Sequence, residues 1–133
     1  MANAIYPKYK QALLDAFTDT DLQSLTAKVA LIDTGVYTYS SAHEFFSSVT
    51  GVIGTPQTLT TKSVTDGVFK ADNVTYTAVT GNSAEALLIY IDTGTASTSR
   101  LVAFIDTGVT GLPVTPNGGN ITVTWNASGI FAL

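Results

Sequence analysis

Three copies of the tripeptide Asp-Thr-Gly are the residues of this chain whose types and spacing could do chemistry. Each copy follows an apolar run, and the aspartates are Asp33, Asp92 and Asp106. Aspartic proteases cleave peptides with two such aspartates that face each other and share one proton, because two carboxylates that close cannot both ionise. In one class of these enzymes each chain supplies one aspartate and a dimer completes the pair. A dimeric aspartic protease that uses Asp33 is therefore one hypothesis.

The same tripeptide also has a purely structural role. An aspartate side chain accepts a hydrogen bond from the backbone two residues later, and glycine adopts the positive φ that a turn requires. Asp92 and Asp106 are 14 residues apart, which leaves room for one hairpin but not for two protease lobes. The residues after the three glycines are Val36, Thr95 and Val109, where the proteases have alanine or serine. We therefore interpret the three copies as the ends of strands.

Other catalytic and metal-binding patterns are weak. The chain has no cysteine and a single histidine, His43, so thiolate and histidine-rich metal sites are excluded within one chain. Glu44 and Glu85 are the only glutamates, and no spacing signal pairs them as the acid and nucleophile of a glycosidase. We expect a protein that is not an enzyme and that carries no cofactor and no metal.

The composition indicates which partners to expect. Only 12% of the residues are charged, against about 25% in an ordinary soluble domain. The six basic residues are scattered, and the net charge is −4, so no basic stripe exists for nucleic acid. No apolar stretch approaches the roughly 18 residues that span a bilayer, and the opening residues lack the apolar core of a signal peptide. The 22 threonines and the shortage of charge suit a protein packed in an assembly, although an ordinary β-domain with a neutral surface fits equally.

The apolar runs before the Asp-Thr-Gly copies predict the centre of the fold. The runs VALI, ALLIYI and LVAFI occupy residues 29–32, 86–91 and 101–105, and each is apolar at consecutive positions. Such strands are buried on both faces and lie in the middle of a sheet. Residues 87–92 and 100–106 are expected to pair as an antiparallel hairpin. Cover for both faces must come from short helices, from a second sheet or from a neighbouring subunit.

From residue 57 onward the remaining pattern is that of strands and turns. Residues 73–79 alternate, with Val74, Tyr76 and Ala78 expected on the buried side, and residues 121–125 alternate in the same way. Asp66-Gly67 is a turn signal.

One or two short helices are expected near the N-terminus. The first covers about residues 8–17. The second covers about residues 41–49, where Ser41 and Glu44 fit a capping box and His43 would lie in the exposed first turn. The fold class is therefore a single mainly-β domain over residues 1–133, either a β-sandwich or a strongly curved antiparallel sheet.

Three stretches together carry a resemblance to a known family. They are MANAIYPKYKQALL at the start, VALIDTGVYTYSSAHEFFSSV in the middle and RLVAFIDTGVTGLPVTPNGGNITVTWNASGIFAL at the end. This pattern resembles small virion structural proteins of tailed bacteriophages. The resemblance implies a capsid decoration or cement protein that is made in the bacterial cytoplasm, binds the major capsid protein on the capsid surface and forms a dimer or trimer. A tail or baseplate component is the alternative within the same class.

A cement protein binds through many weak contacts that act together, and apolar anchors with few charges are expected at its contact surface. The expected anchors are two terminal segments, namely Ile5, Tyr6 and Tyr9 near the start and Ile130, Phe131 and Leu133 near the end. The alternative is that both segments pack into the domain's own core.

Overall fold

The structure is a computed structural model that describes residues 3–133, and the fold is mainly β. In chain order the elements are β1 (Ala4–Ile5), α1 (Pro7–Leu14), η1 (Thr18–Thr20), β2 (Ala27–Ile32), η2 (Phe46–Ser48), β3 (Val52–Thr58), β4 (Ser63–Thr65), β5 (Val68–Lys70), β6 (Val74–Tyr76), β7 (Ala86–Ile91), η3 (Ala96–Thr98), β8 (Arg100–Ile105), β9 (Ile121–Val123) and β10 (Phe131–Ala132). Within the described residues these strands form three antiparallel sheets, ordered β1-β8-β7-β2-β3, β10-β5-β4 and β6-β9.

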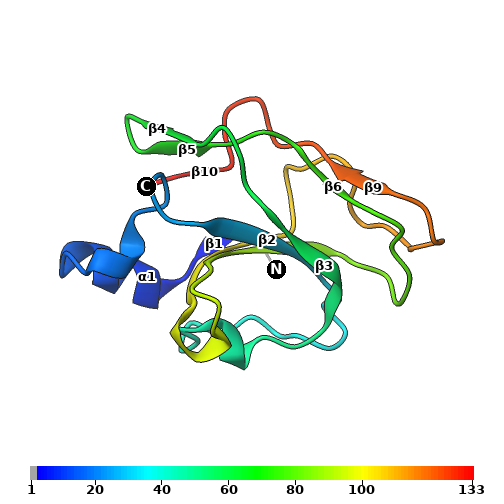
Figure 1. The fold of residues 1–133 in the computed structure, drawn as a ribbon, viewed down its shortest axis with the longest axis horizontal. Coiled ribbons are helices and arrows are strands. Elements are labelled where there is room, and N and C mark those ends of the chain that lie inside the picture. The colour runs from blue at the N-terminus through cyan, green and yellow to red at the C-terminus, as the bar shows by residue number, and fades with distance from the viewer. Residues whose placement is uncertain (1–2) are drawn as a thin grey trace.

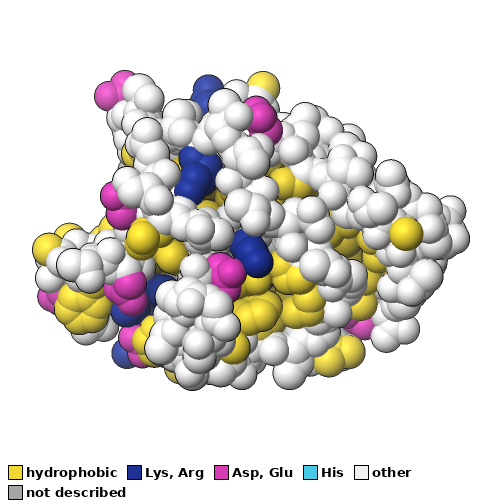
Figure 2. All heavy atoms as spheres, in the orientation of Figure 1, with side chains coloured by type: hydrophobic (Ala, Val, Ile, Leu, Met, Phe, Trp, Pro, Cys, Tyr) yellow, Lys and Arg dark blue, Asp and Glu magenta, His cyan; other side chains and the backbone are white. Residues whose placement is uncertain are grey.

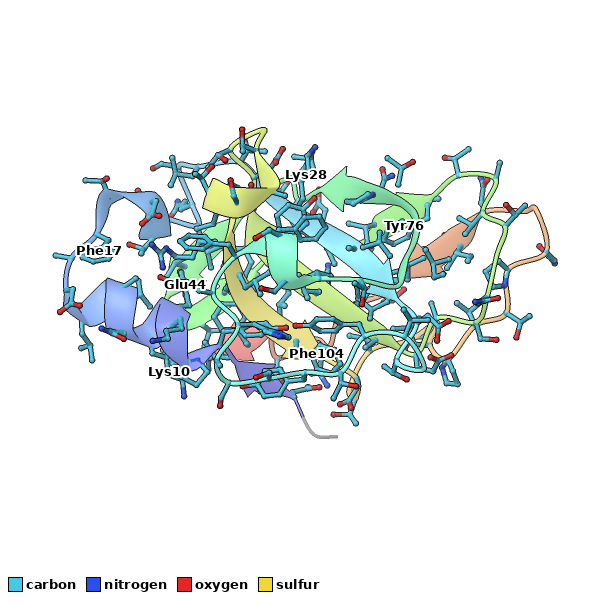
Figure 3. All side chains as sticks on the ribbon, turned by 90° about the horizontal axis from the view of Figure 1, so that it is seen from below. Lys10, Phe17, Lys28, Glu44, Tyr76 and Phe104 are labelled. Atoms are coloured by element: carbon cyan, nitrogen blue, oxygen red, sulfur yellow. The ribbon has the colours of Figure 1, made fainter. Side chains whose placement is uncertain are left out.

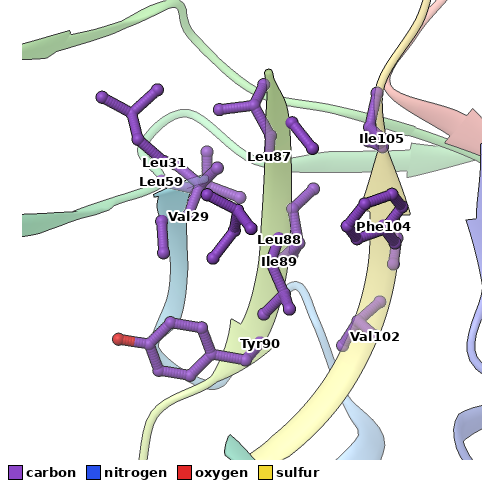
Figure 4. Close-up of a cluster of buried hydrophobic side chains, with 14 of the residues drawn as sticks. Val29, Leu31, Leu59, Leu87, Leu88, Ile89, Tyr90, Val102, Phe104 and Ile105 are labelled. Carbon is purple, nitrogen blue, oxygen red and sulfur yellow. The ribbon is translucent and has the colours of Figure 1, made fainter. Parts of the chain in front are cut away.

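The three apolar runs form the centre of the five-stranded sheet, as predicted. Strands β2, β7 and β8 lie side by side, and β7 and β8 form the expected hairpin with Leu88 opposite Phe104. Every side chain of β7 and β8 is buried, and β2 is buried except at Lys28. Figure 4 shows this cluster, in which leucine, isoleucine and valine side chains project from the three neighbouring strands.

The chain covers both faces of this sheet by itself. The two smaller sheets lie over one face (Figure 1), and Tyr76 on β6 donates a hydrogen bond of 2.9 Å to the carbonyl of Val29 on β2. The segment 36–49 crosses the other face, where the ring of Phe46 stacks on Tyr90 with centroids 4.0 Å apart. Figure 3 views this second face, with the segment running past Phe104. No second copy of the chain is needed to bury the central strands.

The second predicted helix is wrong. Residues 41–45 are not helical, and only η2 forms a single short turn. The backbone is extended here because it pairs with the start of β8: Leu101 N donates to the Glu44 carbonyl (3.0 Å) and Phe46 N to the Ser99 carbonyl (2.8 Å). Long-range pairing therefore overrides a local capping pattern.

Three smaller differences concern the other elements. Helix α1 ends at Leu14, three residues earlier than predicted. The first strand after the helical region begins at Val52 instead of residue 57, and it carries Pro56 at the edge of the sheet, where a missing N–H is tolerated. Ala78 is exposed with a φ of +50°, so the predicted alternation after Tyr76 stops at the end of β6. The alternation of Ile121, Val123 and Trp125 is confirmed, because all three are buried.

Candidate functional site

Two grooves flank β10 at the end of the molecule where α1, β10 and the β4–β5 hairpin gather (Figure 1). The first, which we call the terminal groove, has a volume of about 550 Å³ and runs between the two ends of the chain. Its walls come from β1, from the end of β8 and from β10, and they are lined by Asn3, Ala4, Ile5, Pro7, Lys10, Tyr39, Ala103, Phe104, Ile105, Ile130, Phe131 and Ala132. Among the described residues that line it, Lys10 is the single basic one and none is acidic.

The second groove, which we call the helix groove, has a volume of about 330 Å³ and lies on the other side of β10. It is lined by α1, η1 and the β4–β5 hairpin through Tyr9, Leu13, Thr20, Asp21, Leu22, Gln23, Val64, Gly67, Phe69, Phe131 and Leu133. Phe131 lines both grooves, so β10 forms the ridge between them. Its ring packs against that of Phe69 at 5.4 Å between centroids, which fixes β10 on β5.

Local sequence explains how the two termini reach this place. Pro7 starts α1 at a position where a backbone N–H has no helical partner, so the chain turns sharply after β1. At the other end Gly129 has a φ of +119°, and a Cβ there would lie 2.5 Å from Val68, so only glycine lets the chain approach β5 before β10.

The structure brings the predicted anchors together. Five of the six line the two grooves: Ile5, Tyr9, Ile130, Phe131 and Leu133. The six predicted anchors differ in how far their side chains are buried. Tyr6, Tyr9 and Ile130 are at most 8% exposed and belong to the domain's own core. Ile5 and Phe131 are half-buried, and Leu133 is 66% exposed. The buried three support the walls, whereas the other three present apolar surface, and an interface at these positions stays a prediction.

The buried tyrosines near this end are held by hydrogen bonds. Tyr9 donates to the carbonyl of Thr20 at 2.9 Å, and burial raises the pKa of Tyr9 to about 12, so its hydroxyl stays protonated. The hydroxyls of Tyr6 and Tyr37 lie 2.8 Å apart, and that of Tyr37 lies 2.8 Å from Nδ1 of His43. Burial, with a smaller contribution from the bond to Tyr37, raises the pKa of Tyr6 far above its ordinary value. His43 is thus half-buried and hydrogen-bonded, and the prediction that it is exposed is wrong.

Exposed apolar side chains are concentrated at the same end. Leu14 is 88% exposed, Phe17 49%, Val64 48% and Leu133 66%. Figure 2 shows apolar atoms at the surface around α1, with acidic and basic side chains among them. Exposed apolar side chains that gather at one end of a protein are typical of a contact region.

The first two Asp-Thr-Gly copies form the predicted hydrogen bond to the aspartate, and Gly94 has the predicted positive φ (+87°), but Gly35 does not. Asp33 Oδ1 accepts a hydrogen bond from Gly35 N at 2.8 Å, and Asp92 Oδ1 accepts one from Gly94 N at 3.1 Å. At the third copy Oδ1 of Asn3 accepts the N–H groups of Asp106 and Thr107, at 2.7 and 3.0 Å. The third turn is therefore tied to the N-terminal segment.

Sheet topology separates the aspartates. Strand β7 is antiparallel to both β2 and β8, so Asp92 lies at one end of the sheet and Asp33 and Asp106 lie at the other. A pocket of about 430 Å³ at that other end is lined by Asp106, Glu85, Thr34, Tyr37, Thr38, Tyr39, Phe104 and Pro113, and Asp33 does not line it. Glu85 there accepts hydrogen bonds from the N–H and hydroxyl of Thr34, at 2.9 and 3.0 Å, which anchors the first turn.

We predict a pH dependence for the second turn. The N–H of Gly94 and, less strongly, Lys28 at 3.1 Å lower the pKa of Asp92 in the folded protein. A lowered folded pKa contributes stability above the unfolded value, and that stability is lost as the pH falls through the folded pKa. Asp92→Asn keeps the acceptor oxygen but removes the charge. We expect it to reduce the free energy of unfolding at pH 7 by at most about 1 kcal/mol, since the pair is partly solvated.

Urea denaturation from pH 7 down to pH 2 measures this difference. The difference in the free energy of unfolding between Asp92→Asn and the wild type should vanish near pH 2, where residue 92 is uncharged in both proteins. A difference that stays constant across the range would mean that the charge of Asp92 plays no part.

Sequence reasoning missed Arg100, which is only 4% exposed. Its Nε and Nη2 donate to Oδ2 of Asp19 at 3.0 and 2.9 Å, and its Nη1 donates to Oε2 of Glu44 at 3.3 Å. The rings of Phe17 and Phe45 lie against the guanidinium, with centroids 5.5 and 5.1 Å from its central carbon. Arg100 therefore joins the segment after α1 and the segment 36–49 to β8. The only sequence signal was a basic residue at the start of an otherwise apolar strand.

Residues 3–133 contain no group of three or more histidine, cysteine, aspartate or glutamate side chains that could hold a metal ion. In the same residues no helix is long and apolar enough to cross a membrane. A scan of the sequence against protein-family models finds no match, and a search of curated proteins finds no significant relative.

Proposed function

We propose that this chain is a structural protein of a bacteriophage particle, which binds the lattice of the major capsid protein and stabilises the head without catalysis. The observation that carries the proposal is the convergence of the two terminal segments on β10. Five of the six side chains expected to act as anchors line two adjoining grooves, although they come from opposite ends of the sequence.

The physical character of this surface supports such a role. The helix groove is mainly apolar, and the terminal groove is about half apolar and half polar, with one basic and no acidic residue among the described residues that line it. Contact surfaces of this kind gain affinity from apolar burial, with few charges to desolvate. The core needs no partner for its own burial, so the exposed apolar side chains at this end remain available for contact with another protein.

The terminal groove offers a direct test. Ala132 is exposed and lines it, so Ala132→Arg fills the groove without removing any core atom. We expect this variant to bind purified heads that lack the protein at least about tenfold more weakly than the wild type, which corresponds to a loss of about 1.4 kcal/mol. Thr75→Arg is the matched control, because Thr75 is an exposed strand residue on β6, outside both grooves. Co-sedimentation with heads measures both variants.

Equal binding by Ala132→Arg and by the wild type would contradict the use of this groove. Mass spectrometry of separated heads and tails distinguishes the capsid role from a tail or baseplate role, and absence from both would overturn the proposal. Heads without the protein should also release DNA at a lower temperature.

A further inference from the structure

The edge of the three-stranded sheet is an exposed strand that no other part of residues 3–133 pairs with. Strand β4 lies outermost in the order β10-β5-β4, and Ser63, Val64 and Thr65 are all exposed. In Figure 1 it forms a corner of the molecule beyond β5. An open strand edge presents unpaired backbone groups to another chain. The edge at β3 is different, because Pro56 and a shift of register beside Val29 interrupt it.

The hairpin geometry determines which backbone groups of β4 face outward. Asp66 and Gly67 form a two-residue turn with φ values of +51° and +78°, and Thr65 lies opposite Val68. In such a hairpin the residues that flank the turn exchange both backbone hydrogen bonds, and every second pair along the strands does the same. Val64, opposite Phe69, belongs to the other type of pair. Its N–H and carbonyl therefore point away from β5, toward the open edge.

The residues around Val64 are self-complementary in charge. If two copies of β4 pair antiparallel about a two-fold axis at Val64, each Val64 exchanges both hydrogen bonds with its own counterpart. Ser63 then lies opposite Thr65 of the second copy, and Lys62 lies opposite Asp66 of the second copy. The symmetry produces this attractive pair twice. Within residues 3–133 neither Lys62 nor Asp66 takes part in an ion pair; the Lys62 ammonium donates to the Leu25 carbonyl, and this bond opens when Lys62 reaches Asp66 of the second copy.

Apolar contacts support the same arrangement. Val64 shares a sheet face with Phe69, and it lines the helix groove together with Leu133. Val64 is 48% exposed and Leu133 66% exposed in the single chain. Pairing at β4 places the Val64 side chains of both copies on one continuous face, with a helix groove on each side. We propose that the chain forms a symmetric dimer by antiparallel pairing of β4 with β4 of a second copy.

This dimer adds to the proposed function, but its test does not depend on it, because the dimer is measured in solution without capsids. Two single variants probe the register. Lys62→Glu places a glutamate opposite Asp66, and Asp66→Lys places two lysines opposite each other, so each variant repels itself twice. We expect each alone to dimerise at least about tenfold more weakly than the wild type, as two exposed pairs of about 1 kcal/mol each allow.

The decisive result is the mixture. Lys62→Glu combined with Asp66→Lys restores two attractive pairs in a heterodimer, so sedimentation equilibrium of the equimolar mixture should recover near-wild-type association. Circular dichroism of each variant checks the fold, since Lys62 also donates to the Leu25 carbonyl and Asp66 lies at positive φ. Val64→Pro removes the outward N–H without touching the bonds to β5, and we expect it to be a folded monomer.

A wild type that stays monomeric at about 1 mM overturns the proposal, because that concentration corresponds to only about −4 kcal/mol of association. A dimer that survives Val64→Pro, or a mixture that associates no better than its components, also overturns it and assigns the interface to another surface. None of these results bears on whether Ala132→Arg weakens binding to heads.

Discussion

Leu88→Ala is expected to lower the free energy of unfolding by about 3 kcal/mol, within the range of about 2–5 kcal/mol for buried leucines. Leu88 is fully buried at the centre of β7, between Ala30 on β2 and Phe104 on β8 (Figure 4). Its small neighbour Ala30 cannot fill the space that three lost carbon atoms leave, and the layers on both faces limit collapse. Urea unfolding followed by tryptophan fluorescence measures the change.

Val36→Ala is the control for this variant, because Val36 is 55% exposed on the turn after β2 and its truncation should cost less than about 0.5 kcal/mol. A loss below about 1 kcal/mol for Leu88→Ala would contradict the tight, self-covered core described above.

Arg100→Met is expected to lower the free energy of unfolding by about 2 kcal/mol. Removing one partner of a fully buried ion pair costs about 3–5 kcal/mol. Here the cost is smaller, because the side chains of Asp19 and Glu44 are 36% and 39% exposed and regain water when the guanidinium is lost. Methionine keeps the apolar contact with Phe17 and Phe45, so the variant isolates the charge and its hydrogen bonds. Thermal unfolding measured by calorimetry gives the difference.

Glu44→Gln is the matched control for Arg100. It removes one charge but leaves Arg100 paired with Asp19, and it should cost less than about 1 kcal/mol. If Glu44→Gln costs as much as Arg100→Met, the pair with Asp19 contributes nothing and the role assigned to Arg100 is wrong.

Those parts of the fold that have a local cause were predictable from the sequence. Consecutive apolar residues in 86–91 and 101–105 identify central strands, because only burial on both faces tolerates them. Asp66-Gly67 identifies its hairpin because few residues adopt positive φ in succession. The Asp-Thr-Gly copies at Asp33 and Asp92 were correctly interpreted as turns because an aspartate side chain can bond the backbone two residues later.

Features that depend on distant partners were not predictable. Phe45 and Phe46 share a face in a helix, but in the extended chain they point in opposite directions, one toward Arg100 and the other onto Tyr90. No pattern within residues 41–49 indicates that they pair with β8. The grooves beside β10 were not predicted: the apolar terminal segments singled out Ile5 and Phe131 as expected anchors, but only the completed fold brings the two ends of the chain to one place.

The chain covers both faces of its own central sheet, and this determines the thermodynamics of its binding to another protein. Because the core is complete in the single chain, the protein binds a partner with a preformed surface. The entropy cost of ordering the chain belongs to folding and not to binding. Its binding should then show the heat-capacity change of the contact area alone, without the larger contribution that accompanies coupled folding. An assembly built from such units can gain and lose them individually, and a unit that dissociates remains folded and able to bind again.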